Sequence, residues 1–191
     1  NYRMVTRFSS YHNMPELSLI LASIIDFYNL EDSDDLPEMD GYIDVESIYG
    51  AGSTFTVEIP QGIEEIGEAA FWCLSIKNRI NLTLPQGLKK INHIAFAGLR
   101  FSSLKLNDDL EWIGEKAFMS SIPFQIELPK NLLYVGSAAF GGCGLEGELV
   151  IPESCLSIKG GAFGGNQITK LTLPSRLEII EGGTFQGVGP I

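Results

Sequence analysis

Apolar and polar positions follow one pattern six times over, from about residue 55 to the end of the chain. Each copy has an alternating apolar pair, then a turn residue, then a phenylalanine eleven positions after the turn residue. These turn and phenylalanine positions are Pro60/Phe71, Pro85/Phe96, Asn107/Phe118, Pro129/Phe140, Pro152/Phe163 and Pro174/Phe185. The phenylalanines recur at steps of 25, 22, 22, 23 and 22 residues. A period in this range indicates a solenoid, in which each unit buries its apolar face against its neighbours.

The spacing within a copy predicts its elements. Alternation before the turn indicates a short strand with one face inward, and proline ends the strand because it has no N–H to donate. The inward strand pairs are Val57/Ile59, Leu82/Leu84, Leu104/Leu106, Ile126/Leu128, Leu149/Ile151 and Leu171/Leu173. Further apolar residues follow three and six positions after the turn, and then Ala-Phe or Thr-Phe. We expect one short parallel strand per repeat and short helical turns on the convex side.

The first 55 residues do not follow this period. Pro15 and Glu16 suit the first turn of a helix, which we expect over about 15–29. Eight acidic residues and no basic one lie between Glu31 and Glu46, and we interpret 31–40 as a solvated acidic loop. Alternation then predicts a strand at 42–48, joined by a turn to the strand that enters the solenoid. Residues 1–55 are therefore predicted to form a helix-plus-hairpin cap on a solenoid of residues 56–191.

Two copies show the repeat most clearly. They are VEIPQGIEEIGEAAFWC, from Val57 to Cys73, and IELPKNLLYVGSAAFGGC, from Ile126 to Cys143. This pattern resembles the BspA-like leucine-rich-repeat family of bacterial surface proteins. The resemblance implies an α/β solenoid, a right-handed coil of six repeats. Because members of that family are typically exported adhesins or interaction proteins, it also implies a cell-surface or extracellular location and a host or bacterial protein or glycan as partner.

A second resemblance covers the end of the N-terminal segment. GYIDVESIYGAGSTFTVEIP, from Gly41 to Pro60, is similar to the last two strands of the ATP-binding domain of sensor histidine kinases. The asparagine-bearing Mg²⁺ helix and the glycine-rich lid of that domain have no match in this chain. The resemblance implies, as an alternative to a cap, the remnant of a nucleotide-binding signalling domain at residues 15–60.

Charge and hydropathy exclude two classes of partner. Net charge is −11, but outside the acidic window the chain has 13 basic and 16 acidic residues. Without a basic stripe, we expect no nucleic-acid binding. The longest apolar stretch, Leu17 to Leu30, is short and contains polar residues, so we expect no membrane span. The chain begins at Asn1 rather than Met, and little sequence follows Phe185, so we expect it to be a piece of a longer protein.

Candidate chemistry is sparse. Asp32, Asp34 and Asp35 are spaced like calcium ligands, but Pro37 stands where an EF-hand loop needs glycine. His12 and His93 lack partners at ligand spacing, and the three cysteines have no metal spacing, so we expect buried free thiols. No nucleophile elbow or phosphate loop is present. The sequence therefore predicts no enzyme, no cofactor and no metal site.

What remains is the outward face of the strands. Between the inward residues lies one row, which we call the front row: Glu58, Thr83, Lys105, Glu127, Val150 and Thr172. A flanking row contains Thr56, Asn81, Ser103, Gln125, Glu148 and Lys170. We interpret the front row as the ligand-binding face of a non-catalytic binding module. The alternative is a structural spacer without a specific ligand. Trp72 and Trp112 are expected either to anchor a partner or to pack along the coil.

Overall fold

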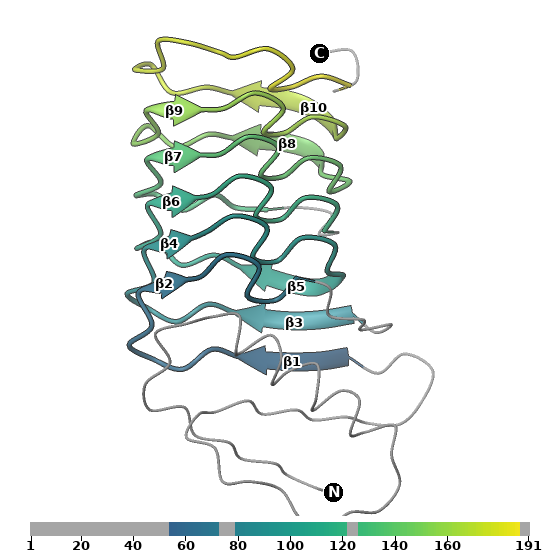
Figure 1. Ribbon diagram of the computed structural model, residues 1–191. Coiled ribbons are helices and arrows are strands. Elements are labelled where there is room, and N and C mark those ends of the chain that lie inside the picture. Colours follow the sequence, from purple (N-terminus) through teal and green to yellow (C-terminus); the bar gives the residue numbers. More distant parts are fainter. Residues whose placement is uncertain (1–53, 73–78, 122–125, 188–191) are drawn as a thin grey trace, which may run out of the picture.

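The computed structural model describes residues 54–72, 79–121 and 126–187, which wind into a solenoid of stacked coils (Figure 1). The helix expected at 15–29, the acidic loop at 31–40 and the strand at 42–48 lie outside the described residues. The strand expected to enter the solenoid is present as β1 (Thr54–Glu58). The periodic part of the sequence is thus the part whose coils are described.

The strands before the turn residues lie along one side of the solenoid, which we call the front face (Figure 1). They are β1, β3 (Arg79–Thr83), β5 (Phe101–Lys105), β8 (Glu146–Val150) and β10 (Gln167–Thr172). The pairing is parallel throughout, in a sheet of order β1-β3-β5 and a second sheet of β8 and β10. The predicted parallel ladder of short strands is confirmed for these five copies.

One copy departs from the prediction. Residues 126–128, which the repeat places between β5 and β8, form no strand, so the expected strand at Ile126/Leu128 is wrong. Both side chains are only half-buried. In the repeat, Pro123 stands at the place where Phe101 begins β5, and proline has no N–H for the ladder. The front face is therefore divided into two sheets at this coil.

A second ladder replaces the helical turns expected on the convex side. It runs β2 (Glu65–Ile66), β4 (Lys90–Ile91), β6 (Trp112–Ile113), β7 (Tyr134–Val135) and β9 (Ser157–Ile158), all parallel. The described residues contain no helix. The predictions of one strand per repeat and of an α/β class are therefore wrong for this part of the chain, which has two strands in most coils.

Hydrogen bonds between coils explain why no helix forms around the phenylalanine. The N–H groups of Ile94, Phe96 and Gly98 donate to carbonyl groups of the next coil, at 3.0, 2.8 and 2.9 Å. The N–H groups of Ala95 and Ala97, between them, close tight turns onto carbonyls three residues earlier. An α-helix needs every successive N–H to reach back four residues. Since alternate N–H groups point along the solenoid axis, this segment stacks as turns.

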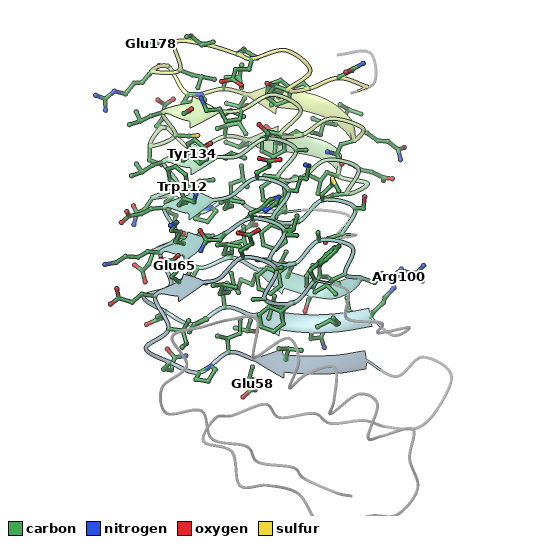
Figure 2. The ribbon with its side chains drawn as sticks, in the orientation of Figure 1. Glu58, Glu65, Arg100, Trp112, Tyr134 and Glu178 are labelled. Carbon is green, nitrogen blue, oxygen red and sulfur yellow. The ribbon has the colours of Figure 1, made fainter. Side chains whose placement is uncertain are left out.

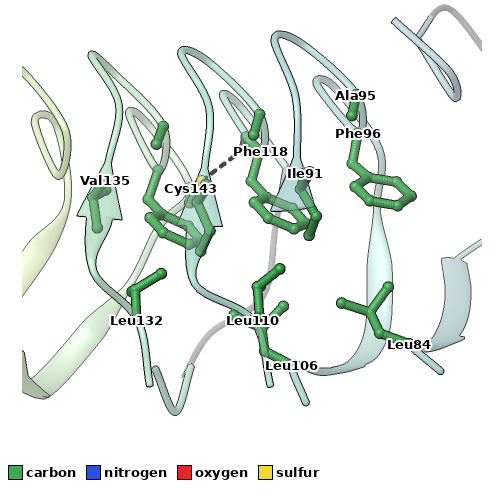
Figure 3. Packing of buried hydrophobic residues seen from close by; sticks show 14 of the residues in the cluster. Leu84, Ile91, Ala95, Phe96, Leu106, Leu110, Phe118, Leu132, Val135 and Cys143 are labelled. Carbon is green, nitrogen blue, oxygen red and sulfur yellow. Dashed lines mark hydrogen bonds between the residues drawn. The ribbon is translucent and has the colours of Figure 1, made fainter. Parts of the chain in front are cut away.

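The core is a continuous column of apolar side chains (Figure 3). The repeat phenylalanines stack face to face, with centroids 4.8 Å apart for Phe71 and Phe96 and 5.3 Å apart for Phe118 and Phe140. The alanine before each phenylalanine is buried in the first five copies, as is Thr184 in the sixth. The predicted inward positions are thus confirmed in most coils. Ile180 is 53% exposed, because no described coil covers it.

Close stacking of the coils also requires a glycine at position 136. A Cβ on Gly136 would lie 2.5 Å from the backbone nitrogen of Glu115 and from the carbonyl carbon of Gly114. Real Cβ atoms do not approach backbone that closely, so a side chain there forces neighbouring coils apart. This glycine is required by the contact between coils and not by a positive φ, since its φ is not in the left-handed region.

Candidate binding face

The front row is exposed and aligned along the solenoid. All six side chains are exposed. Pairing places Glu58 opposite Thr83, Thr83 opposite Lys105, and Val150 opposite Thr172. Glu127 lies in the coil between the two sheets. The predicted residues therefore form two aligned segments with Glu127 between them.

The flanking row is occupied by contacts between coils. The Ser103 hydroxyl donates to the Asn81 side chain at 3.0 Å, and the Lys170 ammonium lies 2.8 Å from the Glu148 carboxylate. Within the described residues, none of the front-row side chains makes a hydrogen bond or an ion pair. The flanking row holds coils together, whereas the front row leaves its polar groups to solvent or to a ligand.

A shallow groove of about 520 Å³ lies on the front face at the coil where the sheets divide. Its walls come from residues 126–130 and from residues 148–154 of the next coil. Glu127 and Val150 of the front row line the groove, and the side chain of Val150 is 52% exposed. The groove thus combines a carboxylate with an exposed aliphatic side chain at the centre of the predicted row.

Most charged groups that line the groove already have partners. Lys130 bonds Asp108 at 3.2 Å, which lowers the pKa of the Asp108 carboxyl, and Glu148 pairs with Lys170. Glu153 accepts from the Ser175 backbone N–H at 3.1 Å. Glu127 has no such partner in the described part of the chain. Glu127 is therefore the carboxylate in this groove without an existing contact among the described residues.

The second ladder carries an outward row of exposed and part-exposed side chains that the sequence did not single out. It consists of the residue before each buried aliphatic residue: Glu65, Lys90, Trp112, Tyr134 and Ser157, aligned by strand pairing. The Trp112 and Tyr134 rings stack with centroids 3.7 Å apart and planes 9° apart. Figure 2 shows Glu65, Trp112 and Tyr134 along one side of the solenoid.

Of the two tryptophans considered from the sequence, Trp112 packs along the coil axis yet stays 40% exposed, and Trp72 is 51% exposed. In the sequence, every residue of this row stands five positions after the turn residue of its copy. That spacing could have identified the row, but the predicted strand pattern did not include the second ladder.

The described cysteines are buried structural groups, as expected. Cys143 and Cys155 are free and fully buried. The Cys143 thiol donates to the Phe118 carbonyl oxygen at 2.9 Å (Figure 3), and burial raises its pKa to about 12. Burial also raises the pKa of Cys155. Because the thiolate is the reactive form, both thiols are unreactive in the folded chain at neutral pH. Cys73 lies outside the described residues.

Other candidate chemistry is not assembled in the described residues. His93 is part-exposed, with its ring nitrogen 3.1 Å from Glu68. No three His, Cys, Asp or Glu side chains converge as a metal site in the part of the chain that is described. His12 and the aspartates at 32–35 lie outside it. The described ranges also contain no helix of the length and hydropathy that crossing a membrane requires.

The fold and the repeat define the class of protein. Parallel strands in stacked coils, with leucine, isoleucine and phenylalanine inward at a period of 22 to 25 residues, make a leucine-rich-repeat solenoid. The sequence profile of the BspA type leucine rich repeat region matches six copies, over residues 27–80 and 73–189. The chain belongs to this family, as the repeat sequence predicted.

Comparison with individual proteins adds one solved structure. A leucine rich cell surface protein from Faecalibacterium prausnitzii A2-165 is similar, with 20% sequence identity and a TM-score of 0.43. The similarity covers 69% of this chain and 45% of that protein, so the chain spans less than half of that protein's length. No curated protein matches the chain.

Proposed function

We propose that this chain is a non-catalytic binding module of a cell-surface protein, and that the front row contacts a protein or a glycan. The observation that supports this proposal most directly is the contrast between two neighbouring rows. Flanking side chains bond from coil to coil, whereas front-row side chains are exposed and unpaired within the described residues. Membership in the BspA-type family favours the surface location.

Glu127 and Val150 are the proposed centre of the contact. The groove places a carboxylate without a partner beside an exposed aliphatic side chain. A ligand there gains apolar contact with Val150 and a charge-assisted hydrogen bond to Glu127. Lys105 and Glu58 extend the row with charges of alternating sign, which favours a partner that carries both kinds of polar group.

The test is to probe the full chain against an array of host glycans and extracellular matrix proteins. For each ligand bound, affinity is then measured for Glu127→Lys and for Glu64→Lys, a matched reversal at an exposed site beside the second ladder. We expect Glu127→Lys to weaken binding at least tenfold, because reversal repels the group that the carboxylate attracts, and Glu64→Lys to leave it unchanged. An array without any bound ligand supports the spacer function instead, and equal affinities for both variants contradict a contact through Glu127.

A further inference from the structure

The outward side of the second ladder changes character along the solenoid. Its first two coils present charged side chains, Glu64 and Glu65 in one and Lys89 and Lys90 in the next. The following coils present mainly apolar side chains, which we call the side patch: Trp112, Leu133, Tyr134, Leu156 and Ile179, with the exposed Glu111 beside Trp112. Trp112 and Leu133 are each 40% exposed, Leu156 is 55% and Ile179 is 69% exposed. Contiguous exposed apolar side chains of this kind mark an interaction surface.

The aromatic stack of the side patch ends at Tyr134. Trp112 covers one face of the Tyr134 ring. The residue aligned with Tyr134 on its other side is Ser157, whose side chain is short, and the repeat places Ile179 at the same position one coil further. No ring therefore continues the stack in the coil of Ser157, about 4.8 Å from the coil of Tyr134. A flat side chain supplied by a partner at this position would continue the stack.

We propose that the occupant of the side patch is a second copy of this chain, docked antiparallel about a two-fold axis at the level of Tyr134. Such an axis lies parallel to the two-residue strands and reverses the order of the coils. The coil of Trp112 then faces the coil of Ser157 in the partner copy, so the large ring of one copy lies opposite the short side chain of the other. The contact is isologous, since each copy supplies one Trp112 and one Ser157.

One pair of charged residues at the edges of the patch fits the same arrangement. The axis that brings Trp112 opposite Ser157 also brings Lys89 of one copy opposite Glu178 of the other. Both residues are exposed, at equivalent positions two coils before and two coils after Tyr134, and within the described residues neither side chain has an ion-pair partner. Figure 2 shows Glu178 on the same side of the solenoid as Trp112 and Tyr134.

The test is the oligomeric state of the full chain by sedimentation equilibrium over a range of concentrations. We expect a monomer–dimer equilibrium that Trp112→Ser weakens at least tenfold, because an interface tryptophan at the centre of a contact dominates its affinity. Serine already stands at this position two coils further on, as Ser157, so the variant is expected to fold. Circular dichroism and urea unfolding of each variant verify this.

A charge exchange tests the antiparallel arrangement independently. Lys89→Glu and Glu178→Lys are each expected to weaken dimerisation, since each places like charges opposite one another, and the double variant is expected to restore it. Within one copy the two positions are four coils, about 19 Å, apart, so restoration requires contact between copies. Lys105→Glu, the same change on the front face, is the control and is expected to leave the dimer intact.

Three results overturn the proposal. The first is a monomer at every concentration. The second is a dimer that Trp112→Ser does not weaken, and the third is a double charge variant no better at dimerising than the single ones. None of these results depends on whether the front row binds a ligand. The dimerisation test can therefore fail while the proposed function holds, or succeed while the proposed function fails.

Discussion

At the scale of single residues, one buried position in the repeat is occupied by different side chains that act as hydrogen-bond donors. Three residues after the phenylalanine, Ser121, Cys143 and Asn166 each donate to the phenylalanine carbonyl of the preceding coil, at 2.6, 2.9 and 2.9 Å. A buried carbonyl without a donor costs about 1–3 kcal/mol. The sequence predicted a buried free thiol at Cys143, and the structure shows that a hydrogen-bond donor is used at this position of the repeat.

The cost of losing this donor is expected to differ between coils. Asn166 donates to the Phe140 and Phe163 carbonyls and accepts from the Leu145 N–H, so Asn166→Leu leaves several buried groups unpaired. We expect it to lower the free energy of unfolding by at least about 3 kcal/mol. The Phe118 carbonyl keeps its bond from the Ser121 N–H when Cys143 is replaced, so Cys143→Val is expected to cost about 1 kcal/mol or less.

Urea unfolding followed by circular dichroism measures both variants. Equal losses of stability would contradict this explanation, because the two substitutions differ chiefly in how many backbone groups they leave without a partner.

At the scale of the elements, the stacked phenylalanines are the rigid feature of the coil. Their planes lie within 15° of one another along the column. The sequence predicted a fixed segment from turn to phenylalanine, with all length variation falling after the ring. The structure adds that these eleven residues pass through the second ladder and place each ring on the ring of the preceding coil.

Removal of a ring is expected to cost most in the middle of the column. Phe118 is buried and stacks on Phe96 and Phe140, so Phe118→Ala leaves a cavity with walls on both sides. We expect a loss of about 3–5 kcal/mol. Phe185 is half-buried and stacks only on Phe163 among the described rings, so Phe185→Ala is expected to cost less than half as much. Thermal or urea unfolding of the two variants measures the difference in stability. A Phe185 variant as unstable as the Phe118 variant would contradict the model of a stacked column.

At the scale of the whole molecule, stability is expected to be nearly a sum over coils. Each coil bonds to the coils beside it, through parallel ladders and stacked rings, which is the basis of one-dimensional cooperativity in repeat proteins. The front face and the side patch lie on different ladders, so a ligand and a second copy can be bound at once.

Deletion of one whole coil tests this additivity. Removing residues 129–151 joins Leu128 to Pro152, which keeps the order of strand and turn. We expect a folded solenoid with a smaller urea m-value, because less surface is exposed on unfolding. The control removes only residues 129–140 and joins the strand segment of one copy directly to the loop that follows the phenylalanine of that same copy. This chain is expected not to fold, and a control as stable as the whole-coil deletion would refute the additive description.

The sequence by itself determined the period, the inward positions and the family. These follow from residue types at fixed spacing, because apolar side chains that recur at the same position of each copy are buried together in the core. It determined the front row in the same way, because alternation along a strand fixes which side chains point outward.

Only the tertiary structure decided the second ladder, the division of the front face at residues 126–128 and the stacking of Trp112 on Tyr134. Each of these depends on which group of the next coil lies opposite a given backbone N–H or ring. That partner is more than twenty residues away in sequence, so local pattern does not specify it. Stacking of the coils determines the choice between a helical turn and a two-residue strand, and with it the surface that the side patch occupies.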